Sequence, residues 1–160
     1  MNVDPKPGDA GRETGAGAST RSMMAAYLGT LLAFCLLDFA WLGLLAPSFY
    51  QSQIGGLLLD VPRWPAVVFF YLLYIVGLVA LCILPVVRAT GDADTDGRMK
   101  VALSGALFGL VAYGTYNLSN LATLDGWTVP VTMVDMIWGT VASAIACTSG
   151  HLAVRRFGLR

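Results

Sequence analysis

Charged side chains are scarce in this sequence of 160 residues, of which 12% are Asp, Glu, Lys or Arg and 56% are hydrophobic. An ordinary soluble domain has about 25% charged residues, and a soluble chain of this length could not bury so much apolar surface. The lysines and arginines form no basic run, so the electrostatic footprint of a nucleic-acid-binding protein is missing. We therefore expect lipid to be the solvent for most of the chain.

Residues that commonly bind metals are also few. Cys35, Cys82 and Cys147 lie singly in apolar runs without a CxxC spacing, and His151 is the only histidine. Ligands spaced in this way do not predict a metal site, and no nucleophile elbow or phosphate-binding loop is found. We expect no metal, no cofactor and no catalytic residue, and we interpret the cysteines as packing residues and His151 as an interfacial one.

Long hydrophobic runs, by contrast, are abundant. There are four of them, at about residues 23–46, 66–87, 99–124 and 129–150. Each is close to the roughly 20 residues that a helix needs to cross a bilayer. The first 22 residues are rich in Gly, Pro and charge, and we expect a disordered tail there. The predicted fold is all-α, an antiparallel bundle of four transmembrane helices over residues 23–156.

Lysines and arginines are distributed unevenly among the segments that connect these runs. Nine of the ten lie in the N-terminal tail, in the connection at 88–100 or in the C-terminal tail, and Arg63 alone lies on the opposite side. Cytoplasmic connections carry the excess of Lys and Arg in membrane proteins. Both termini are therefore predicted to be cytoplasmic.

With this orientation, the spans bring polar and aromatic side chains to their outer halves. At about 1.5 Å per residue, both aspartates and the tyrosines of the second span lie roughly 9 to 13 Å below the outer boundary. The candidate residues are Asp38, Trp41, Tyr71, Tyr74, Tyr113, Tyr116, Asn117, Asn120, Asp135 and Trp138. They predict a polar, acidic pocket that opens outward.

The inner halves of the third and fourth spans carry small residues instead. These are Gly105 and Gly109 in the third span and Gly139, Ala142 and Ala146 in the fourth. Small residues let two helices approach closely in lipid, so we expect tight packing on the cytoplasmic side. The helical spacing also predicts that Tyr116 and Asn120 continue the line of the two glycines of the third span.

Asp38 and Asp135 are the most informative residues of the polar layer. An acid in the middle of a span costs about 2.5 to 3.5 kcal/mol on insertion scales, and the only Lys or Arg within the four spans is Lys100, at the cytoplasmic start of the third. Each aspartate must therefore be neutral and hydrogen-bonded, or compensated by something other than a side-chain cation. Each also has a tryptophan three residues further on, Trp41 and Trp138, which lies on the same helix face.

Six short motifs in this order resemble a bacterial family of small predicted inner-membrane proteins, domain of unknown function 2177. The motifs are Leu37-Asp38-xx-Trp41-Leu-Gly43, Tyr71-Leu-Leu-Tyr74, Gly105-Ala-Leu-Phe-Gly109, Tyr113-Gly-Thr-Tyr-Asn-Leu-Ser-Asn120, Ala122-Thr-Leu-Asp-Gly-Trp127 and Asp135-xx-Trp138-Gly139. An Asp and a Thr commonly occupy the positions of Asn117 and Ser119 in that family. The resemblance implies a multi-pass protein of the bacterial inner membrane and supplies no activity.

Three classes of function agree with these features. The polar layer can be structural and fix the register of the helices in a membrane scaffold or interaction protein. It can bind or translocate a proton, a cation or a small amphipathic molecule, with the aspartates as charge partners. Small four-helix exporters use this principle, usually as dimers, although their motifs differ from these; a homo-oligomer is thus one expected form. The third class is a lipid-modifying enzyme that uses one Asp as general acid or base.

Overall fold

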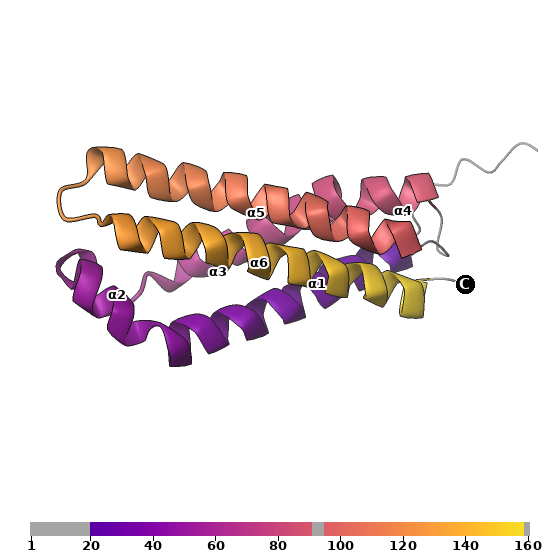
Figure 1. The fold of residues 1–160 in the computed structure, drawn as a ribbon. Coiled ribbons are helices and arrows are strands. Elements are labelled where there is room, and N and C mark those ends of the chain that lie inside the picture. Colours follow the sequence, from indigo (N-terminus) through magenta and orange to yellow (C-terminus); the bar gives the residue numbers. More distant parts are fainter. Residues whose placement is uncertain (1–19, 91–94, 159–160) are drawn as a thin grey trace, which may run out of the picture.

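The computed structural model describes residues 20–90 and 95–158 (Figure 1). Residues 1–19 of the tail expected over residues 1–22 lie outside this part of the chain, and its last three residues are helical, since the first helix begins at Thr20. The elements are α1 (Thr20–Ala40), η1 (Trp41–Leu45), α2 (Pro47–Ile54), η2 (Gly55–Leu57), α3 (Trp64–Gly77), η3 (Leu78–Ile83), α4 (Leu84–Thr90), α5 (Thr95–Thr123), α6 (Val129–Ala153) and η4 (Val154–Gly158). The described residues are helical or lie in turns and connections, without a strand. The predicted all-α fold is therefore confirmed.

Four helices are long and apolar enough to cross a membrane, as the hydrophobic runs predicted. They cover Thr20–Leu45, Trp64–Ala89, Asp96–Thr123 and Val129–Phe157. The first combines α1 with η1, and the second combines α3, η3 and α4. The start of α1, the end of α4, the start of α5 and the end of α6 lie at one end of the bundle, and α2 lies at the other (Figure 1). These two ends are called the terminal end and the α2 end below.

Prolines explain where the helices change their geometry. The wide π-helical turn η1 ends directly before Ala46 and Pro47, and the amide of Ala46 bonds to the carbonyl oxygen of Trp41 at 2.8 Å. The second π-helical turn, η3, ends two residues before Pro85. Because proline has no N–H and its ring crowds the preceding turn, a locally widened helix can relieve the clash. The chain thus continues through Pro85 as α4 but turns into a new helix at Pro47.

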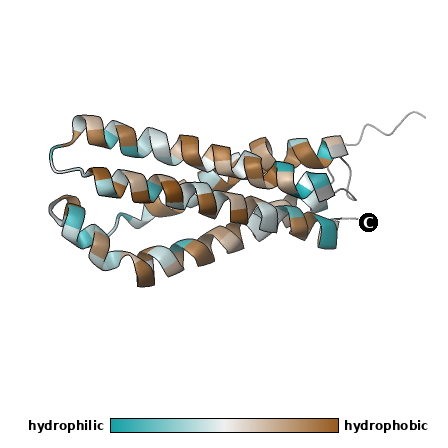
Figure 2. Cartoon of the chain, viewed as in Figure 1, coloured by the Kyte–Doolittle hydropathy of each residue, from teal (hydrophilic) through white to brown (hydrophobic). Residues whose placement is uncertain are grey.

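A tight turn joins α5 to α6 at the α2 end. Gly126 has a φ of +85°, a conformation that favours glycine, and the side-chain oxygen of Thr128 accepts a hydrogen bond from the amide of Val131. This short connection makes α5 and α6 an antiparallel hairpin that stays in contact along its length. Figure 2 shows apolar residues along the bundle and hydrophilic ones on α2 and near the terminal end.

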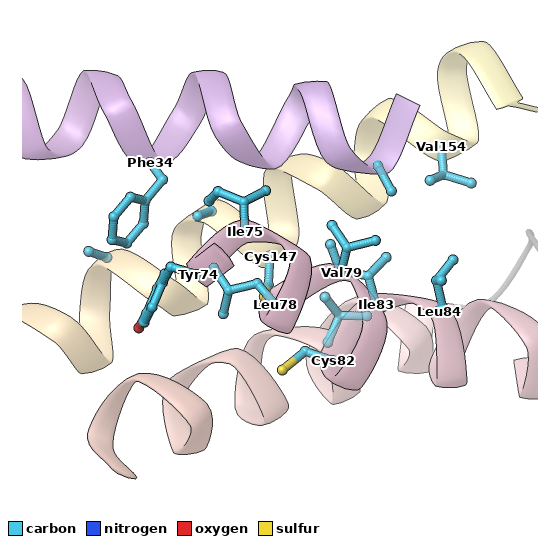
Figure 3. Packing of buried hydrophobic residues seen from close by; sticks show 14 residues of the cluster. Phe34, Tyr74, Ile75, Leu78, Val79, Cys82, Ile83, Leu84, Cys147 and Val154 are labelled. Carbon is cyan, nitrogen blue, oxygen red and sulfur yellow. The ribbon is translucent and has the colours of Figure 1, made fainter. Parts of the chain in front are cut away.

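The apolar core lies between α1, the second span and the α5–α6 hairpin. Figure 3 shows Phe34 beside Tyr74, with Ile75, Leu78 and Cys147 further along, and all five are buried. The largest share of this core belongs to η3 and the end of α3. Since the second span contacts α5 through η3, the outer half of α3 is left with space between itself and α5.

Small residues hold α6 against both of its neighbours. A Cβ atom added at Gly105 would lie 2.8 Å from the carbonyl oxygen of Ser143, and one at Gly109 would clash with the carbonyl of Gly139. Ala142 and Ala146 are fully buried on the same side of α6. At the terminal end, a Cβ at Gly29 of α1 would lie 2.6 Å from the Cβ of Ala153. The helix backbones are thus in near contact here, which no larger residue would permit.

Candidate functional site

Towards the α2 end, the helices enclose a cavity of about 710 Å³, called the outer cavity below. All of α1, α2, α3, α5 and α6 contribute side chains to its wall. Seven of the ten candidate residues line it, namely Asp38, Trp41, Tyr71, Tyr113, Tyr116, Asp135 and Trp138. Its lining contains no Lys, Arg or His among the described residues.

Asp38 of α1 is enclosed by donors from two other helices. The hydroxyl of Tyr71 donates a hydrogen bond to its Oδ2 at 2.9 Å, and the indole Nε1 of Trp138 donates to its Oδ1 at 3.0 Å. The residue is only 3% exposed. Both carboxyl oxygens are therefore occupied, and the group connects α1 with α3 and α6 within the membrane.

Asp135 of α6 is held by a different set of residues. The hydroxyl of Tyr50 in α2 donates a hydrogen bond to its Oδ1. The indole Nε1 of Trp41 donates in turn to the Tyr50 oxygen at 3.1 Å. This chain of donors ties η1 and α2 to α6.

Each of the two tryptophans supports the aspartate of the other span by hydrogen bonding. Trp138 shares its helix with Asp135 but donates its N–H to Asp38. Trp41 shares its span with Asp38 but donates its N–H to Tyr50, which in turn donates to Asp135. Their rings stack with centroids 4.5 Å apart and planes 9° apart. The spacing of three residues predicted the shared face, whereas this exchange depends on how α1 and α6 meet.

The remaining candidate residues are placed around this centre. The Tyr74 hydroxyl lies 2.8 Å from the Oγ of Ser143, deeper in the bundle, and the Tyr113 ring occupies the space that a side chain at position 139 would need. Asn120 is half-buried and lines neither the outer cavity nor the one next to it. It stands apart from the centre that the other candidates form.

The predicted line of residues on the third span needs a correction. Tyr116 is 55% exposed, although it lines the outer cavity, whereas Asn117 is fully buried. The buried line of α5 that begins at Gly105 and Gly109 therefore continues to Asn117 rather than to Tyr116 and Asn120. The row from Gly105 through Gly109 and Tyr113 to Asn117 advances in steps of four residues, which is one of the rows along which a neighbouring helix packs.

The most important residue missing from the sequence-based set is Tyr50. It lies in a connecting segment of mixed aromatic and polar residues, and such a segment also suits an interfacial helix. The only feature of the sequence that could have indicated its role is a phenol hydroxyl about one helix turn after Pro47. Tyr50 lies outside the membrane-spanning helices; burial first, and then its hydrogen bond to Asp135, raise the pKa of its phenol. It therefore remains a protonated donor well into the alkaline range.

The chemistry of the outer cavity is that of carboxyl groups and aromatic rings. Among the residues that the structure describes, no three His, Cys, Asp or Glu side chains gather in a way that could hold a metal ion. Trp127, at the turn between α5 and α6, and Phe70 of α3 add two more rings to the wall. The faces of aromatic rings can in general interact with organic cations.

Four membrane-spanning helices around a layer of carboxyl and aromatic groups define a polytopic membrane protein. The chain belongs to the family of predicted membrane proteins DUF2177, whose model matches residues 23–152. The resemblance carried by the six motifs is thus confirmed. No curated protein and no solved structure matches the chain.

Proposed function

We propose that the protein binds an organic cation in the outer cavity, with Asp135 as the charge partner. One observation carries the proposal: two carboxyl groups line a single cavity whose described lining includes no cationic side chain. A buried carboxylate is costly unless a positive charge or several donors compensate it. A cation that enters the cavity would supply the missing charge.

The surrounding rings support an organic cation over a metal ion. The stacked pair of Trp41 and Trp138, together with Tyr113 and Tyr116, lines the cavity. The negative faces of aromatic rings attract ammonium and related ions, and the effect is largest where water is excluded. A hydrated metal ion would instead require several more oxygen ligands than the two aspartates provide.

The two aspartates are assigned different roles. Asp38 has both oxygens occupied and is almost inaccessible, which favours a structural role for that half of the polar layer. Asp135 is 9% exposed and also lines a second cavity that Asp38 does not reach. The structural interpretation of the layer thus applies to Asp38, and the binding interpretation applies to Asp135.

The proposed setting is a bacterial inner membrane with both termini in the cytoplasm. The helix ends at the terminal end carry five arginines, Arg21, Arg88, Arg98, Arg155 and Arg156. Arg63 directly precedes α3, towards the α2 end. This asymmetry favours the terminal end as the cytoplasmic one. The outer cavity then faces the opposite side. A fluorescent protein fused to the C-terminus should fluoresce, and alkaline phosphatase fused there should be inactive; the reverse result would invert the proposed orientation.

Binding is tested with the purified protein and tetraphenylphosphonium, a bulky organic cation, by following tryptophan fluorescence. The neutral triphenylphosphine oxide serves as the uncharged comparison. We expect saturable binding of the cation alone, and a loss of about tenfold in affinity in Asp135→Asn, which corresponds to about 1.4 kcal/mol. The matched control is Asp125→Asn, which removes the same charge from an exposed turn. Equal binding to the cation and the neutral compound would refute the proposal.

A further inference from the structure

A second cavity of about 460 Å³, called the side pocket here, adjoins the outer cavity between α3 and α5. The two cavities share Phe70, Tyr113, Tyr116 and Asp135 in their walls. Asp135 therefore stands at the junction, where a group bound in the outer cavity can be reached from between the two helices. This gap exists because the second span meets α5 through η3 rather than through the outer half of α3.

A third hollow, called the α3 groove here, continues from the side pocket along the second span. It shares Phe70 and Tyr74 with the side pocket and ends at Ala80 and Leu81, with Phe108 of α5 on its other side. The whole lining of this hollow is apolar apart from the hydroxyl of Tyr74, which is engaged with Ser143. From Phe70 to Leu81 it is about 16 Å long at about 1.5 Å per residue, close to half of a hydrocarbon core of about 30 Å.

We infer that the ligand is a single-chain cationic amphiphile, whose head lies at Asp135 and whose hydrocarbon chain lies in the α3 groove. This inference rests on the proposed function and names the class of its ligand. The outer cavity, at one end of these adjoining hollows, carries carboxyl groups without a described cation, and the α3 groove at the other end is apolar. That distribution matches an ammonium head with one alkyl chain. A phosphate-bearing head would meet the two carboxyl groups with charge of the same sign.

The route of entry follows from the same geometry. The side pocket lies between two membrane-spanning helices, so a chain can pass sideways from lipid between α3 and α5 while its head moves to Asp135. Phe108 closes this gap towards the terminal end, where its ring packs against Tyr74 with centroids 5.4 Å apart. A Cβ added at Gly77 would lie 2.8 Å from the Phe108 ring, so the two helices touch at this level.

The location of the chain is tested by photo-crosslinking with dodecyltrimethylammonium that carries a diazirine on its last carbon. The full-length protein is held in amphipol without free detergent, and labelled residues are mapped by mass spectrometry. We expect labelling to concentrate at Val76, Ala80, Leu81 and Phe108. Leu32 and Leu36 of α1 are the comparison, since they are 62% and 61% exposed on another lipid-facing surface. Equal labelling of both surfaces would overturn the inference.

A chain-length series separates this inference from the proposed function. Tetramethyl-, octyltrimethyl- and dodecyltrimethylammonium are compared as competitors of bound tetraphenylphosphonium. We expect affinity to rise about fourfold per added methylene. Ala80→Trp fills the groove at an exposed position, so it should flatten this rise and leave tetraphenylphosphonium binding intact. Ala122→Trp, at an exposed position of α5 away from the groove, is the control and should change neither the rise nor tetraphenylphosphonium binding.

The failures of the two proposals are distinguishable. If tetraphenylphosphonium binds through Asp135 but the series is flat in the unmodified protein, the cation site stands and the chain groove is refuted. An unchanged rise in Ala80→Trp would likewise refute the groove. If no cation binds at all, both the proposed function and this inference are wrong.

Discussion

The two ends of the bundle use opposite packing strategies. Towards the terminal end, α6 lies against α5 and α1 through glycines, alanines and small polar residues, and the backbones are nearly in contact. Towards the α2 end, the same helices are held apart by tryptophan and tyrosine rings that hydrogen-bond to two aspartates. The change from small residues to aromatic rings occurs at Gly139. Its carbonyl lies against Gly109, and the Tyr113 ring lies against its Cα.

This contrast explains why a cavity exists at only one end. In lipid there is little hydrophobic drive between helices, so close packing and hydrogen bonds decide which surfaces meet. Small residues allow the close packing, and the network around the two aspartates provides the hydrogen bonds while it leaves room between the rings. The closed half can therefore serve as a rigid base for an open half, and the predictions below test that division.

The largest effect is expected from Gly109→Ala, because the added Cβ would clash with the backbone of Gly139. We expect a loss of about 3 kcal/mol or more in the free energy of unfolding, since backbone atoms cannot move aside. Gly114→Ala on the same helix is the control, as its Cβ would meet only the flexible end of Met136 at 3.4 Å. Thermal unfolding in detergent, followed by circular dichroism, measures both. Equal stability of the two variants would show that the closed half is not rigid.

Replacing Asp38 should have the next largest effect. Asp38→Ala leaves the Tyr71 hydroxyl and the Trp138 N–H buried without their acceptor, which we expect to cost about 2 to 3 kcal/mol. Asp38→Asn keeps an acceptor oxygen and should lose less than half as much. Asp135→Asn should remain folded while its affinity for the cation falls about tenfold. If Asp38→Ala unfolds no more readily than the wild type, the network does not hold the open half together.

Trp138→Phe should have an intermediate effect. The variant loses the hydrogen bond to Asp38 and part of the stacking with Trp41, so we expect a destabilisation of about 1 to 2 kcal/mol. The near-ultraviolet circular dichroism of the indoles should fall, since the rigid stacked pair is gone. Trp64→Phe is the matched control, because Trp64 is 63% exposed at the start of α3. A larger spectral loss in the control would contradict the stacked arrangement.

The smallest effect is expected from Tyr50→Phe, which removes one hydroxyl and keeps the ring. Loss of its hydrogen bond to Asp135 should cost about 1 kcal/mol, so the amides of residues 48–54 should exchange about fivefold faster. Ser52→Ala, which loses only a local, exposed hydrogen bond to Phe49, should leave that exchange unchanged. Hydrogen exchange measured by mass spectrometry distinguishes the two. Unchanged exchange in Tyr50→Phe would mean that α2 does not depend on Asp135.

Much of the fold could be predicted because lipid imposes simple rules. Four long apolar runs and the prolines between them were sufficient for the four helices. Candidate residues such as Asp38 and Asp135 were found because an acid in an apolar helix needs a special environment. Tyr50 was not found, since a tyrosine between two spans is common at membrane interfaces and nothing in the local sequence ties it to a residue 85 positions away.

The amino-acid sequence by itself determined the all-α class, the four spans and the small residues of α5 and α6, because these follow from local hydropathy and helical spacing. Only the tertiary structure decided that Trp138 bonds to Asp38, that Tyr50 bonds to Asp135, and that α3 stands away from α5. These contacts join residues on different helices, so they depend on crossing angles and on the widened turns η1 and η3. Such quantities arise from packing the whole bundle and have no signature within a single helix.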